Sequence, residues 1–269
     1  MSRSSDQELV AEIRDAYATS ADGWAAGPAA IYRRLATALV ATAHERLTGR
    51  RVLDLGAGTG VASDALIAVG AQPFGLDLAV EMLTHRQARR PPGVAGDARS
   101  LPFRDGVFDA VVAAFSLNHV PDLARSLSEC RRVLHRGGLV LASTFPSGDD
   151  HPAKAVVEEV LRRHGYRRPD WYDTFKKRIA ELTGDPEAFA RAARDTGLTD
   201  VQVGRREVDA GLDQPELAVA WRLNMPHTLG FVTGLDPARR AELHRHATEA
   251  VRGPLPSTVT MLTLRATAA

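Results

Sequence analysis

Apolar residues recur along this chain in two different rhythms. From about Arg51 to Phe145, short apolar runs alternate with amphipathic segments, and the strongest run, Val107–Ala114, is apolar on both faces apart from Asp109. A strand that is apolar on both faces lies inside a sheet that helices cover on both sides. The pattern therefore predicts an α/β chain with a mainly parallel sheet between two helical layers.

The same periodicities place the individual elements. The segments with strand character are Arg51–Leu55, Pro73–Leu78, Val94–Gly96, Val107–Ala114, Leu139–Phe145, Val201–Val208 and Thr258–Arg265. The segments with helical spacing are Leu9–Tyr17, Ala29–Leu47, Val61–Val69, Ala79–Arg89, Pro121–Leu134, Pro152–His164, Asp170–Leu182, Pro186–Thr196, Gln214–Met225 and Pro237–Val251. Pro226 is expected to end the helix before it.

Helical segments outside this alternation predict a cap beside the sheet. We expect an N-terminal helical cap, a cofactor-binding core, two cap insertions and two returns to the core, in the order 1–49, 50–145, 146–182, 183–208, 209–256 and 257–269. The two cap insertions, 146–182 and 209–256, would then build the acceptor pocket, because clefts for small ligands often form between such parts.

Composition narrows the setting of the protein but not its chemistry. The 269 residues carry a formal net charge of +1, so no strong overall field favours nucleic acid or an anionic membrane. Arginine pairs such as Arg131–Arg132 are expected to be solvated surface. Cys130 is the only cysteine, which excludes an internal disulfide, and it is expected to be buried. Without an apolar run of membrane-spanning length or a leader-like N-terminus, a cytoplasmic location is expected.

A strand that ends in a glycine-rich turn is the most informative stretch. Val52–Leu55 runs into Gly56-Ala57-Gly58-Thr59-Gly60, after which a helix is expected to begin. Glycines permit positive φ and let a ligand approach the backbone closely. Ligands of open α/β sheets bind at the carboxyl ends of the strands. The turn is therefore the expected position of a cofactor.

Two carboxylates follow the next two strands. Asp77 ends Phe74-Gly75-Leu76-Asp77, where it can accept hydrogen bonds from both hydroxyls of a ribose. Asp97, in Gly96-Asp97-Ala98, can accept from the exocyclic amine of adenine. Together they indicate a nucleoside-bearing ligand. A dinucleotide-binding oxidoreductase is the rival interpretation, but its G-x-G-x-x-G pattern needs a glycine where this chain has Val61.

These residues resemble a known family. The run from Asp54 to Gly60 resembles motif I of class I S-adenosylmethionine-dependent methyltransferases, and Asp77 matches their ribose-binding acid. The run from Gly96 to Asp109, with Leu101-Pro102-Phe103, resembles the small-molecule branch related to the ubiquinone/menaquinone methyltransferases, the type 11 family. The similarity covers Arg51–Phe145 well and the rest of the chain loosely.

The resemblance implies a fold and a cofactor. The fold would be a Rossmann-like α/β/α sandwich whose mostly parallel seven-stranded sheet has a reversed last strand, with an α-helical cap. The cofactor would be S-adenosyl-L-methionine (SAM). The residues implied to bind it are Tyr17, Trp24, Asp54, Gly56, Ala57, Gly58, Asp77, Leu78, Asp97, Ala98 and Ser116.

The resemblance also implies separate roles within that set. Asp54 would orient the glycine turn and help to hold the cofactor's ammonium group. Leu78 would pack on the adenine, and Ser116 would lie near the sulfonium. Tyr17 and Trp24 would fold over the cofactor; packing within the cap is the alternative for both.

His119 is the candidate catalytic residue. It follows the fourth strand, at the rim where acceptors enter in this fold, and a neutral imidazole suits proton removal near physiological pH. Shaping the pocket, or capping the helix that follows Pro121, are the alternatives. Large aromatic and apolar residues expected in the cap also favour a small acceptor over nucleic acid or protein; they are Trp171, Tyr172, Phe175, Trp221, Met225, His227 and Phe231.

The sequence thus predicts a methyltransferase acting on a small molecule, with O-methylation of a secondary metabolite favoured. A non-methylating SAM-binding enzyme of the same fold, such as a cyclase, and an NAD-dependent oxidoreductase are the alternatives. No metal site is expected, because Asp149-Asp150-His151 has no second cluster to complete a ligand set. The oligomeric state is expected to be a monomer or a homodimer.

Overall fold

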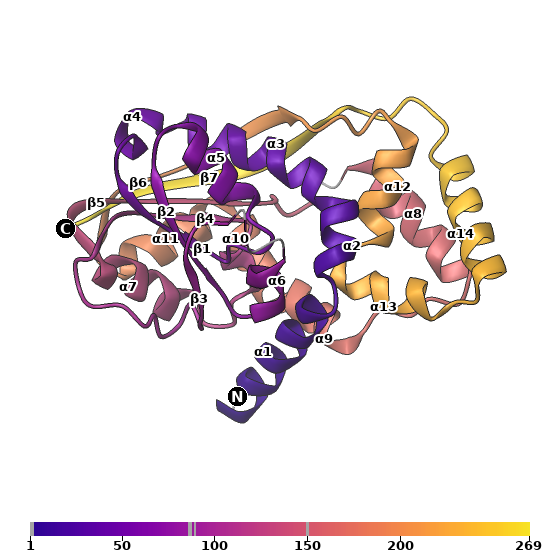
Figure 1. The fold of residues 1–269 in the computed structure, drawn as a ribbon, viewed down its shortest axis with the longest axis horizontal. Helices are drawn as coiled ribbons and strands as arrows, with labels where there is room; N and C mark the ends of the chain where they lie inside the picture. Colours follow the sequence, from indigo (N-terminus) through magenta and orange to yellow (C-terminus); the bar gives the residue numbers. More distant parts are fainter. Residues whose placement is uncertain (1–2, 86–87, 89, 149–150) are drawn as a thin grey trace.

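The computed structural model describes residues 3–85, 88, 90–148 and 151–269. A twisted sheet with its helices makes up one end of the molecule, and a lobe of helices makes up the other (Figure 1). The N-terminal helix projects from the middle of the molecule, at the junction of these two parts.

One seven-stranded sheet forms the core. Its strands are β1 (Arg51–Leu55), β2 (Gln72–Asp77), β3 (Gly93–Ala95), β4 (Phe108–Ala114), β5 (Leu134–Thr144), β6 (Leu198–Asp209) and β7 (Thr258–Ala268). Their order is β3-β2-β1-β4-β5-β7-β6, in which β7 is antiparallel to both of its neighbours and the other pairs are parallel. The reversed last strand was expected and is confirmed.

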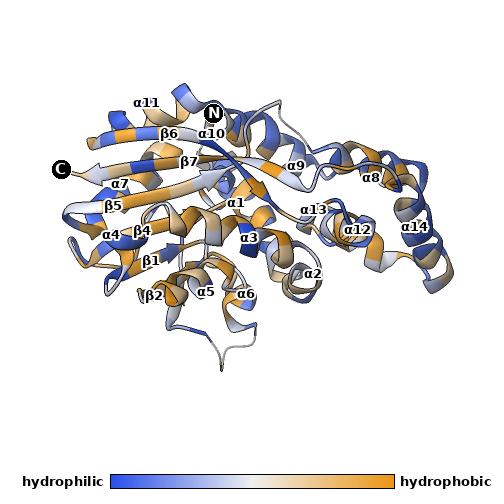
Figure 2. Cartoon of the chain, turned by 90° about the horizontal axis from the view of Figure 1, so that it is seen from above, coloured by the Kyte–Doolittle hydropathy of each residue, from blue (hydrophilic) through white to orange (hydrophobic). Residues whose placement is uncertain are grey.

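Successive residues of the central strands face opposite helical layers. The helices of the structure are α1 (Arg3–Ala18), α2 (Ala21–Ala26), α3 (Pro28–Ala41), α4 (His44–Leu47), α5 (Val61–Ala68), α6 (Val80–Thr84), α7 (Leu123–Val133), α8 (Pro152–Arg163), α9 (Asp170–Phe175), α10 (Glu181–Gly184), α11 (Pro186–Asp195), α12 (Pro215–Leu223), α13 (Pro226–Gly234) and α14 (Pro237–Ala250). Val52 and Ala110 pack toward α3 and α5, whereas Leu53 and Val111 pack toward α7 and α11. The apolar strands run between these two layers in Figure 2, so the three-layer fold is confirmed.

A separate apolar cluster stabilises the helical lobe. Val157 and Leu161 of α8 pack against Leu223 of α12 and Leu243 of α14, with Val232 of α13 beside them. The lobe therefore has a small core of its own beyond the carboxyl ends of the strands.

The N-terminal segment is divided between core and cap. Ile31, Leu35 and Leu39 of α3 are fully buried in the cluster that includes strand residues, so α3 is part of a layer of the sandwich. Only α1 and α2 lie over the junction with the lobe (Figure 1). The expectation that all of 1–49 is cap is corrected in this respect, and we propose the remaining division as stated above.

Three expected boundaries of helices and strands differ from those in the structure. The helix expected at Ala29–Leu47 breaks after Ala41, where α3 ends and the short α4 follows. Pro226 does not only end a helix: it begins α13, because proline fits the first turn, where no N–H is needed. β5 begins at Leu134 rather than Leu139, and its register against β4 shifts between these two residues.

Other expectations concern single segments. Cys130 is fully buried, as predicted, and burial raises the pKa of its thiol to about 12. The helix expected at Ala79–Arg89 is described as far as Thr84, and Arg89 lies outside the described residues. In the part of the chain that the structure describes, no helix combines the length and the apolar character that a membrane crossing needs.

Candidate functional site

A cavity opens at the carboxyl ends of β1, β2 and β4, under α1 and α2. It encloses about 1030 Å³, its open mouth included. Ten of the eleven residues implied to hold the cofactor line it, and so does His119; the ten are Tyr17, Trp24, Gly56, Ala57, Gly58, Asp77, Leu78, Asp97, Ala98 and Ser116. Asp54 does not line it. The fold therefore brings residues from five separate segments to one place.

The glycine-rich turn needs its glycines. Gly56, Gly58 and Gly60 have φ of 74°, 51° and 96°, values that side chains rarely adopt. A Cβ at Gly56 would lie 2.3 Å from Cβ of Ser116, so the turn after β1 and the turn after β4 meet without room for another atom. The N–H groups of Gly56 and Ala57 donate to the carbonyl of Leu76, which fixes the turn against β2.

Asp77 joins the glycine turn to the end of β2. One carboxylate oxygen accepts from the N–H of Gly58 at 2.7 Å, and the other accepts from the N–H of Ala79 at 3.0 Å. Burial raises the pKa of the Asp77 carboxyl, and these two hydrogen bonds act against that rise. Each oxygen has a second lone pair, so the carboxylate can still accept from two ribose hydroxyls.

Asp97 is held by its own neighbour. Its carboxylate accepts from Nε and Nη2 of Arg99, the latter at 2.7 Å, and from the N–H of Arg99 at 2.8 Å. Burial favours the neutral acid, but the hydrogen bonds from Arg99 outweigh it and lower the pKa of Asp97. Asp97 therefore stays ionised, and an adenine amine has to share its oxygens with this guanidinium.

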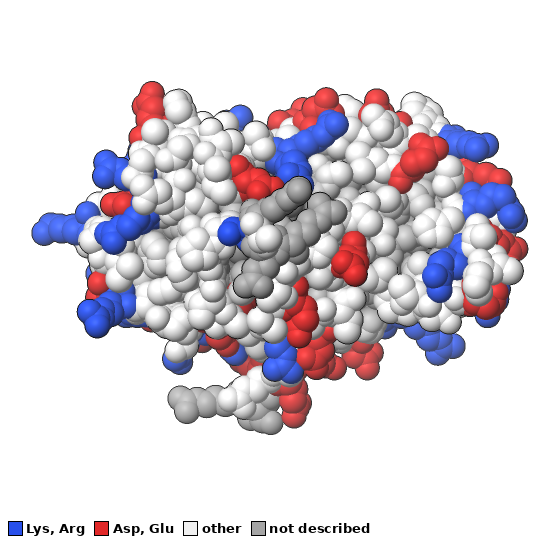
Figure 3. Space-filling view, in the orientation of Figure 1, with Lys and Arg blue, Asp and Glu red and all other residues white. Residues whose placement is uncertain are grey.

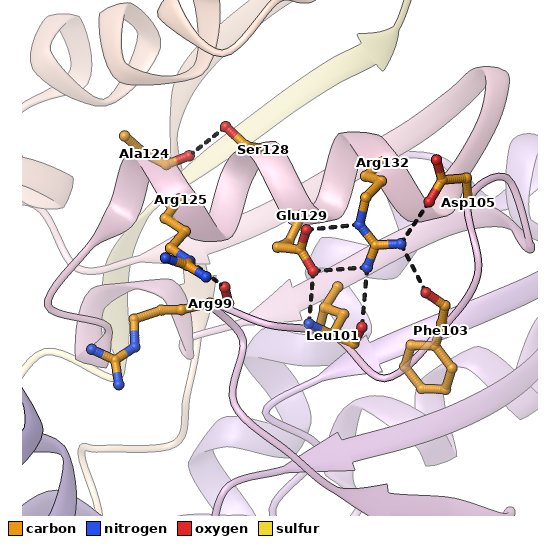
Figure 4. Close-up of polar contacts among 9 residues, drawn as sticks. All are labelled: Arg99, Leu101, Phe103, Asp105, Ala124, Arg125, Ser128, Glu129 and Arg132. Atoms are coloured by element: carbon orange, nitrogen blue, oxygen red, sulfur yellow. Dashed lines mark hydrogen bonds and ion pairs between the residues drawn. The ribbon is translucent and has the colours of Figure 1, made fainter.

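A brace from α7 holds the loop that follows Asp97 (Figure 4). Glu129 accepts from the N–H of Leu101 at 2.7 Å and from Nε and Nη2 of Arg132. Arg132 also donates to the carbonyls of Leu101 and Phe103 and to the carboxylate of Asp105. The side chain of Arg132 was expected to be solvated at the surface. Instead its guanidinium connects α7 to the loop that follows Asp97.

Asp54 lies beneath the glycine turn. Its Oδ2 accepts from the hydroxyl of Ser63 on α5 at 2.6 Å, whereas its buried Oδ1 has no partner among the described residues. Burial raises the pKa of Asp54 to about 6, and the hydrogen bond from Ser63 opposes this rise. The geometry fits the implied orienting role. The charge of Arg90 also acts against the rise, and whether Asp54 helps to hold an ammonium group stays a prediction.

Tyr17 and His119 meet over the cavity from segments 102 residues apart. Oη of Tyr17 lies 3.0 Å from Nε2 of His119, and Nδ1 of His119 lies 3.2 Å from the carbonyl oxygen of Phe115. A carbonyl can only accept, so Nδ1 carries the proton and Nε2 accepts from Tyr17. Burial lowers the pKa of His119 to about 4, which leaves the imidazole neutral near pH 7.

A strained turn after β4 places His119 and Ser116. Phe115 has φ of 58°, a left-handed value that is uncommon for a bulky residue. Its ring is buried against Tyr32 and Phe145, which holds the turn in place. Ser116 then donates to the carbonyl of Leu55 at 2.5 Å. Tyr32 and Phe115 could not be predicted from the sequence, because their participation depends on long-range packing.

The large side chains predicted for the cap divide among three apolar clusters. Phe175 stacks on His119 with centroids 4.7 Å apart, and Trp171 and Tyr172 pack in the same cluster as Phe175. Trp221 and Met225 belong to the main core, and Phe231 packs on Tyr166 within the separate core of the lobe. None of them is among the residues that line the cavity, and Phe175 reaches its rim through His119.

His151 has a structural role. Its Nδ1 accepts from the N–H of Ala153 at the start of α8, and its Nε2 donates to the carbonyl of Pro256 at 2.7 Å. Both ring nitrogens are thereby used within the protein, while Asp149 and Asp150 lie outside the described residues. Among the residues that are described, no three potential ligands come together as a metal site.

Charges are mixed over the face shown in Figure 3, where Lys and Arg alternate with Asp and Glu over both ends of the molecule. A surface of this kind does not favour one polyanionic partner. The cavity, rather than this face, carries the features that indicate a ligand.

The cavity fits the cofactor that the motifs imply. Asp77, with a free lone pair on each carboxylate oxygen, and the ionised Asp97 line the cavity beside the glycine turn, while Asp54 lies beneath that turn. The N–H groups of Gly56, Ala57 and Gly58 already donate within the protein, so the two carboxylates carry the fit. These residues suit an amino-acid-bearing adenosine, and Val61 stands where a dinucleotide-binding turn has its third glycine.

Comparisons with known proteins agree with this geometry. A family profile described as "Methyltransferase domain" matches residues 53–142. The demethylmenaquinone methyltransferase of Mycolicibacterium gilvum is 36% identical over 159 residues, which span 56% of this chain and 69% of that enzyme. The enzyme of the same name from Renibacterium salmoninarum is 34% identical over 183 residues, 65% of this chain and 76% of the relative.

Solved structures share the fold. Phosphoethanolamine N-methyltransferase 2 of Haemonchus contortus, in complex with SAM, has a TM-score of 0.55 at 21% identity, over 87% of this chain and 52% of that one. The [4+2]-cyclase SpnF has a TM-score of 0.51 at 22% identity, over 87% and 80% of the two chains. With the motif geometry and the curated relatives, these findings establish that the chain belongs to the class I SAM-dependent methyltransferases, in the branch of the ubiquinone/menaquinone enzymes.

Proposed function

We propose that this methyltransferase acts on a small hydroxylated aromatic compound of the quinol type and adds the methyl group to a ring carbon. The observation that carries the proposal is the hydrogen bond from Tyr17 to His119, which lies where the cofactor cavity meets a set of aromatic side chains. The printed names of the relatives, demethylmenaquinone methyltransferases, support an acceptor of this class.

SAM, when bound, supplies a methyl group that its positive sulfonium already activates. The protein therefore has to align the acceptor, exclude water and remove a proton. Tyr17 and Trp24 cover the cavity from α1 and α2, and the apolar rings of Tyr32 and Phe115 line the methyl side. These groups exclude water from the place where an acceptor ring would lie.

The tyrosine–histidine pair can take the proton of an acceptor hydroxyl. Because Oη of Tyr17 donates to Nε2 of His119, the lone pairs of that oxygen are free to accept. The proton of Tyr17 can pass to His119 as Tyr17 takes up the proton of the acceptor. The electron pair left on the acceptor oxygen makes the ring carbon beside it nucleophilic. Once methylated, this carbon loses its own hydrogen as a proton, and the oxygen regains a proton, which restores the aromatic ring and the hydroxyl. Positioned acid–base groups of this kind contribute factors of about 10² to 10⁴.

O-methylation of a secondary metabolite, which the sequence favoured, is the second candidate. The same relay supports it, because the deprotonated oxygen could itself take the methyl group. A non-methylating reaction of the same fold is the third, and the fold shared with a [4+2]-cyclase does not decide between them.

The test is turnover of a reduced demethylnaphthoquinone bearing a short prenyl chain, with SAM that carries a ¹³C-labelled methyl group. The expected product gains one methyl group, releases S-adenosylhomocysteine and shows the label bonded to ring carbon by NMR. A label bonded to oxygen would favour the second candidate. Product without release of S-adenosylhomocysteine would contradict methyl transfer altogether.

A further inference from the structure

A series of ring contacts leads from His119 into the cap. The imidazole of His119 stacks on Phe175, the ring of Phe175 lies 5.6 Å from Tyr172, and Tyr172 stacks on His227 with centroids 3.8 Å apart and 11° between the planes. The carbonyl of His227 accepts from Oη of Tyr166, which fixes the position of that residue. These contacts connect His119, at the rim of the cavity, to α13.

A second series reaches the same region from the other side of the cavity. Trp24 lies 4.8 Å from Tyr32, Tyr32 lies 6.0 Å from Phe145, and Phe145 lies 6.5 Å from Trp221, as ring centroids. Tyr17 packs on both Trp24 and His119, so the two series share their starting point. Such separations are typical of interacting aromatic pairs.

Arg222 contacts the last residue of each series, Trp221 and His227. Its Cζ lies 5.3 Å from the Trp221 ring, and its Nη2 lies 3.4 Å from Nε2 of His227. The residue is 6% exposed, and its Nε has no hydrogen-bond partner. In the described part of the chain, no carboxylate forms an ion pair with it. His227 is neutral, because burial, and secondly Arg222 itself, lower its pKa well below the ordinary value.

A buried guanidinium without an anion is costly. Breaking a buried ion pair by removing one partner is strongly destabilising, because the remaining charge is left uncompensated. Arginine also presents five N–H donors in a planar fork that matches a carboxylate. Here the side chain makes one long contact with a neutral imidazole, and its buried Nε–H has no partner. These donors are suited to an anionic group that comes with a ligand.

We propose that Arg222 binds a carboxylate carried on the aromatic ring of the methyl acceptor, with His227 beside it. The inference rests on the proposed function, which places an aromatic acceptor in the cavity lined by Tyr17, Trp24 and Tyr32. It adds one chemical feature to that acceptor, a carboxylate on the hydroxylated ring system. Arg222 lies behind the cavity wall rather than in it: it contacts Trp221, which packs on Phe145, and Phe145 packs on Tyr32, a residue that lines the cavity.

A binding experiment tests the anion site independently of turnover. Full-length protein saturated with S-adenosylhomocysteine is titrated by calorimetry with 1-hydroxy-2-naphthoate and with 1-naphthol, which differ by the carboxylate. The wild type is expected to bind the carboxylate at least tenfold more tightly. Arg222→Gln should remove this preference and leave 1-naphthol affinity within about twofold. Arg163→Gln, an exposed cap arginine paired with Glu159, should keep the preference.

A second measurement covers the case in which Arg222→Gln does not fold. In wild-type protein with ¹⁵N-labelled arginine, the buried Nε–H signal assigned to Arg222 through Arg222→Lys should shift when 1-hydroxy-2-naphthoate is added, and not with 1-naphthol. Equal affinity for the two probes, or an unchanged Nε–H signal at saturation, would overturn the proposal. A carboxylate preference without methylation of any hydroxylated aromatic would overturn the proposed function alone.

Discussion

The hydroxyl of Tyr17 donates to Nε2 of His119 across 3.0 Å, while Nδ1 of the same imidazole donates to the carbonyl of Phe115. The two contacts fix the tautomer and the orientation of a buried histidine at the rim of the cofactor cavity. They connect a helix that covers the cavity to the turn that follows β4. Opening or tilting of α1 would break the pair, so the proton relay depends on the cover being in place.

Removing either partner should slow turnover and spare the cofactor. We expect Tyr17→Phe and His119→Gln each to lower kcat about a hundredfold, because each interrupts proton removal from the acceptor. The dissociation constant of S-adenosylhomocysteine, measured by calorimetry, should change by less than about threefold. His244→Gln, on the exposed side of α14, is the matched control and should keep full activity. Equal losses in kcat and cofactor affinity would contradict a role in proton transfer.

Ionisation of His119 should couple to stability in acid. Its pKa is about 4 in the folded protein and about 6.5 when exposed, so between these values the unfolded chain binds more protons. The contribution of the neutral His119 to the free energy of unfolding is complete above pH 6.5. As the pH falls toward 4, this contribution decreases by about 3 kcal/mol at most.

Urea unfolding of wild type and His119→Gln between pH 4 and pH 7.5 measures this coupling. The difference in unfolding free energy between the two proteins should narrow as the pH falls, since glutamine does not titrate. Other buried histidines are present in both proteins and cancel in the difference. A difference that is constant with pH would show that His119 is not held neutral by the fold.

The glycine turn should tolerate no side chain at Gly56. Gly56→Ala adds a Cβ that would meet Cβ of Ser116 at 2.3 Å, at a φ of 74°. Overpacking of this kind costs about 1–3 kcal/mol beyond the strain of the left-handed backbone. Gly49→Ala has the same φ but nothing within 4 Å, so it isolates the strain alone. Thermal unfolding should show a clearly larger loss for Gly56→Ala, and an equal loss would refute the predicted clash.

The brace from α7 should govern recognition of the adenine base. Glu129→Gln removes the charged acceptor of the Leu101 N–H and one partner of Arg132. We expect a three- to tenfold weaker affinity for S-adenosylhomocysteine, and a smaller ratio between this ligand and its deaminated analogue S-inosylhomocysteine, because the Asp97 loop is less firmly held. Glu249→Gln, an exposed residue near Arg245 on α14, should leave the ratio unchanged.

The positions closest to the glycine turn could be predicted from sequence because they are local. Asp77 and Asp97 each follow a short strand, and parallel strands bring their carboxyl ends to one edge, so spacing along the chain was enough. Ten of the eleven predicted positions line one cavity, and their binding of the cofactor stays a prediction. Asp54 is the exception: it lies under the turn, since alternation along β1 turns its side chain toward α5.

Long-range contacts could not be predicted in the same way. Nothing in the local pattern pairs Tyr17 with His119, and Arg132 looks like an ordinary surface arginine on an amphipathic helix. Nothing in the sequence around Arg222 indicates that its side chain is buried, or that no carboxylate among the described residues pairs with it. Helix α13 was not predicted, because a proline can mark either the end of one helix or the start of the next. Packing in the lobe determines that Pro226 starts a helix.

Asp77 is the residue whose role in cofactor binding can be tested with a close control. Asp77→Asn should weaken S-adenosylhomocysteine binding by about 1–3 kcal/mol, because an amide accepts fewer and weaker hydrogen bonds from the ribose than a carboxylate does. Asp64→Asn changes an exposed acid on α5 that pairs with Arg33, and it should leave the affinity unchanged. Calorimetry of the three proteins gives the comparison.

A crystal structure with S-adenosylhomocysteine tests the central claim most directly. We predict that both ribose hydroxyls donate to the carboxylate of Asp77, that the adenine amine donates to Asp97 beside Leu78, and that the amino-acid portion lies against Gly56 to Gly58. A ligand bound elsewhere, or bound here with its ribose turned away from Asp77, would contradict the assignment of the site.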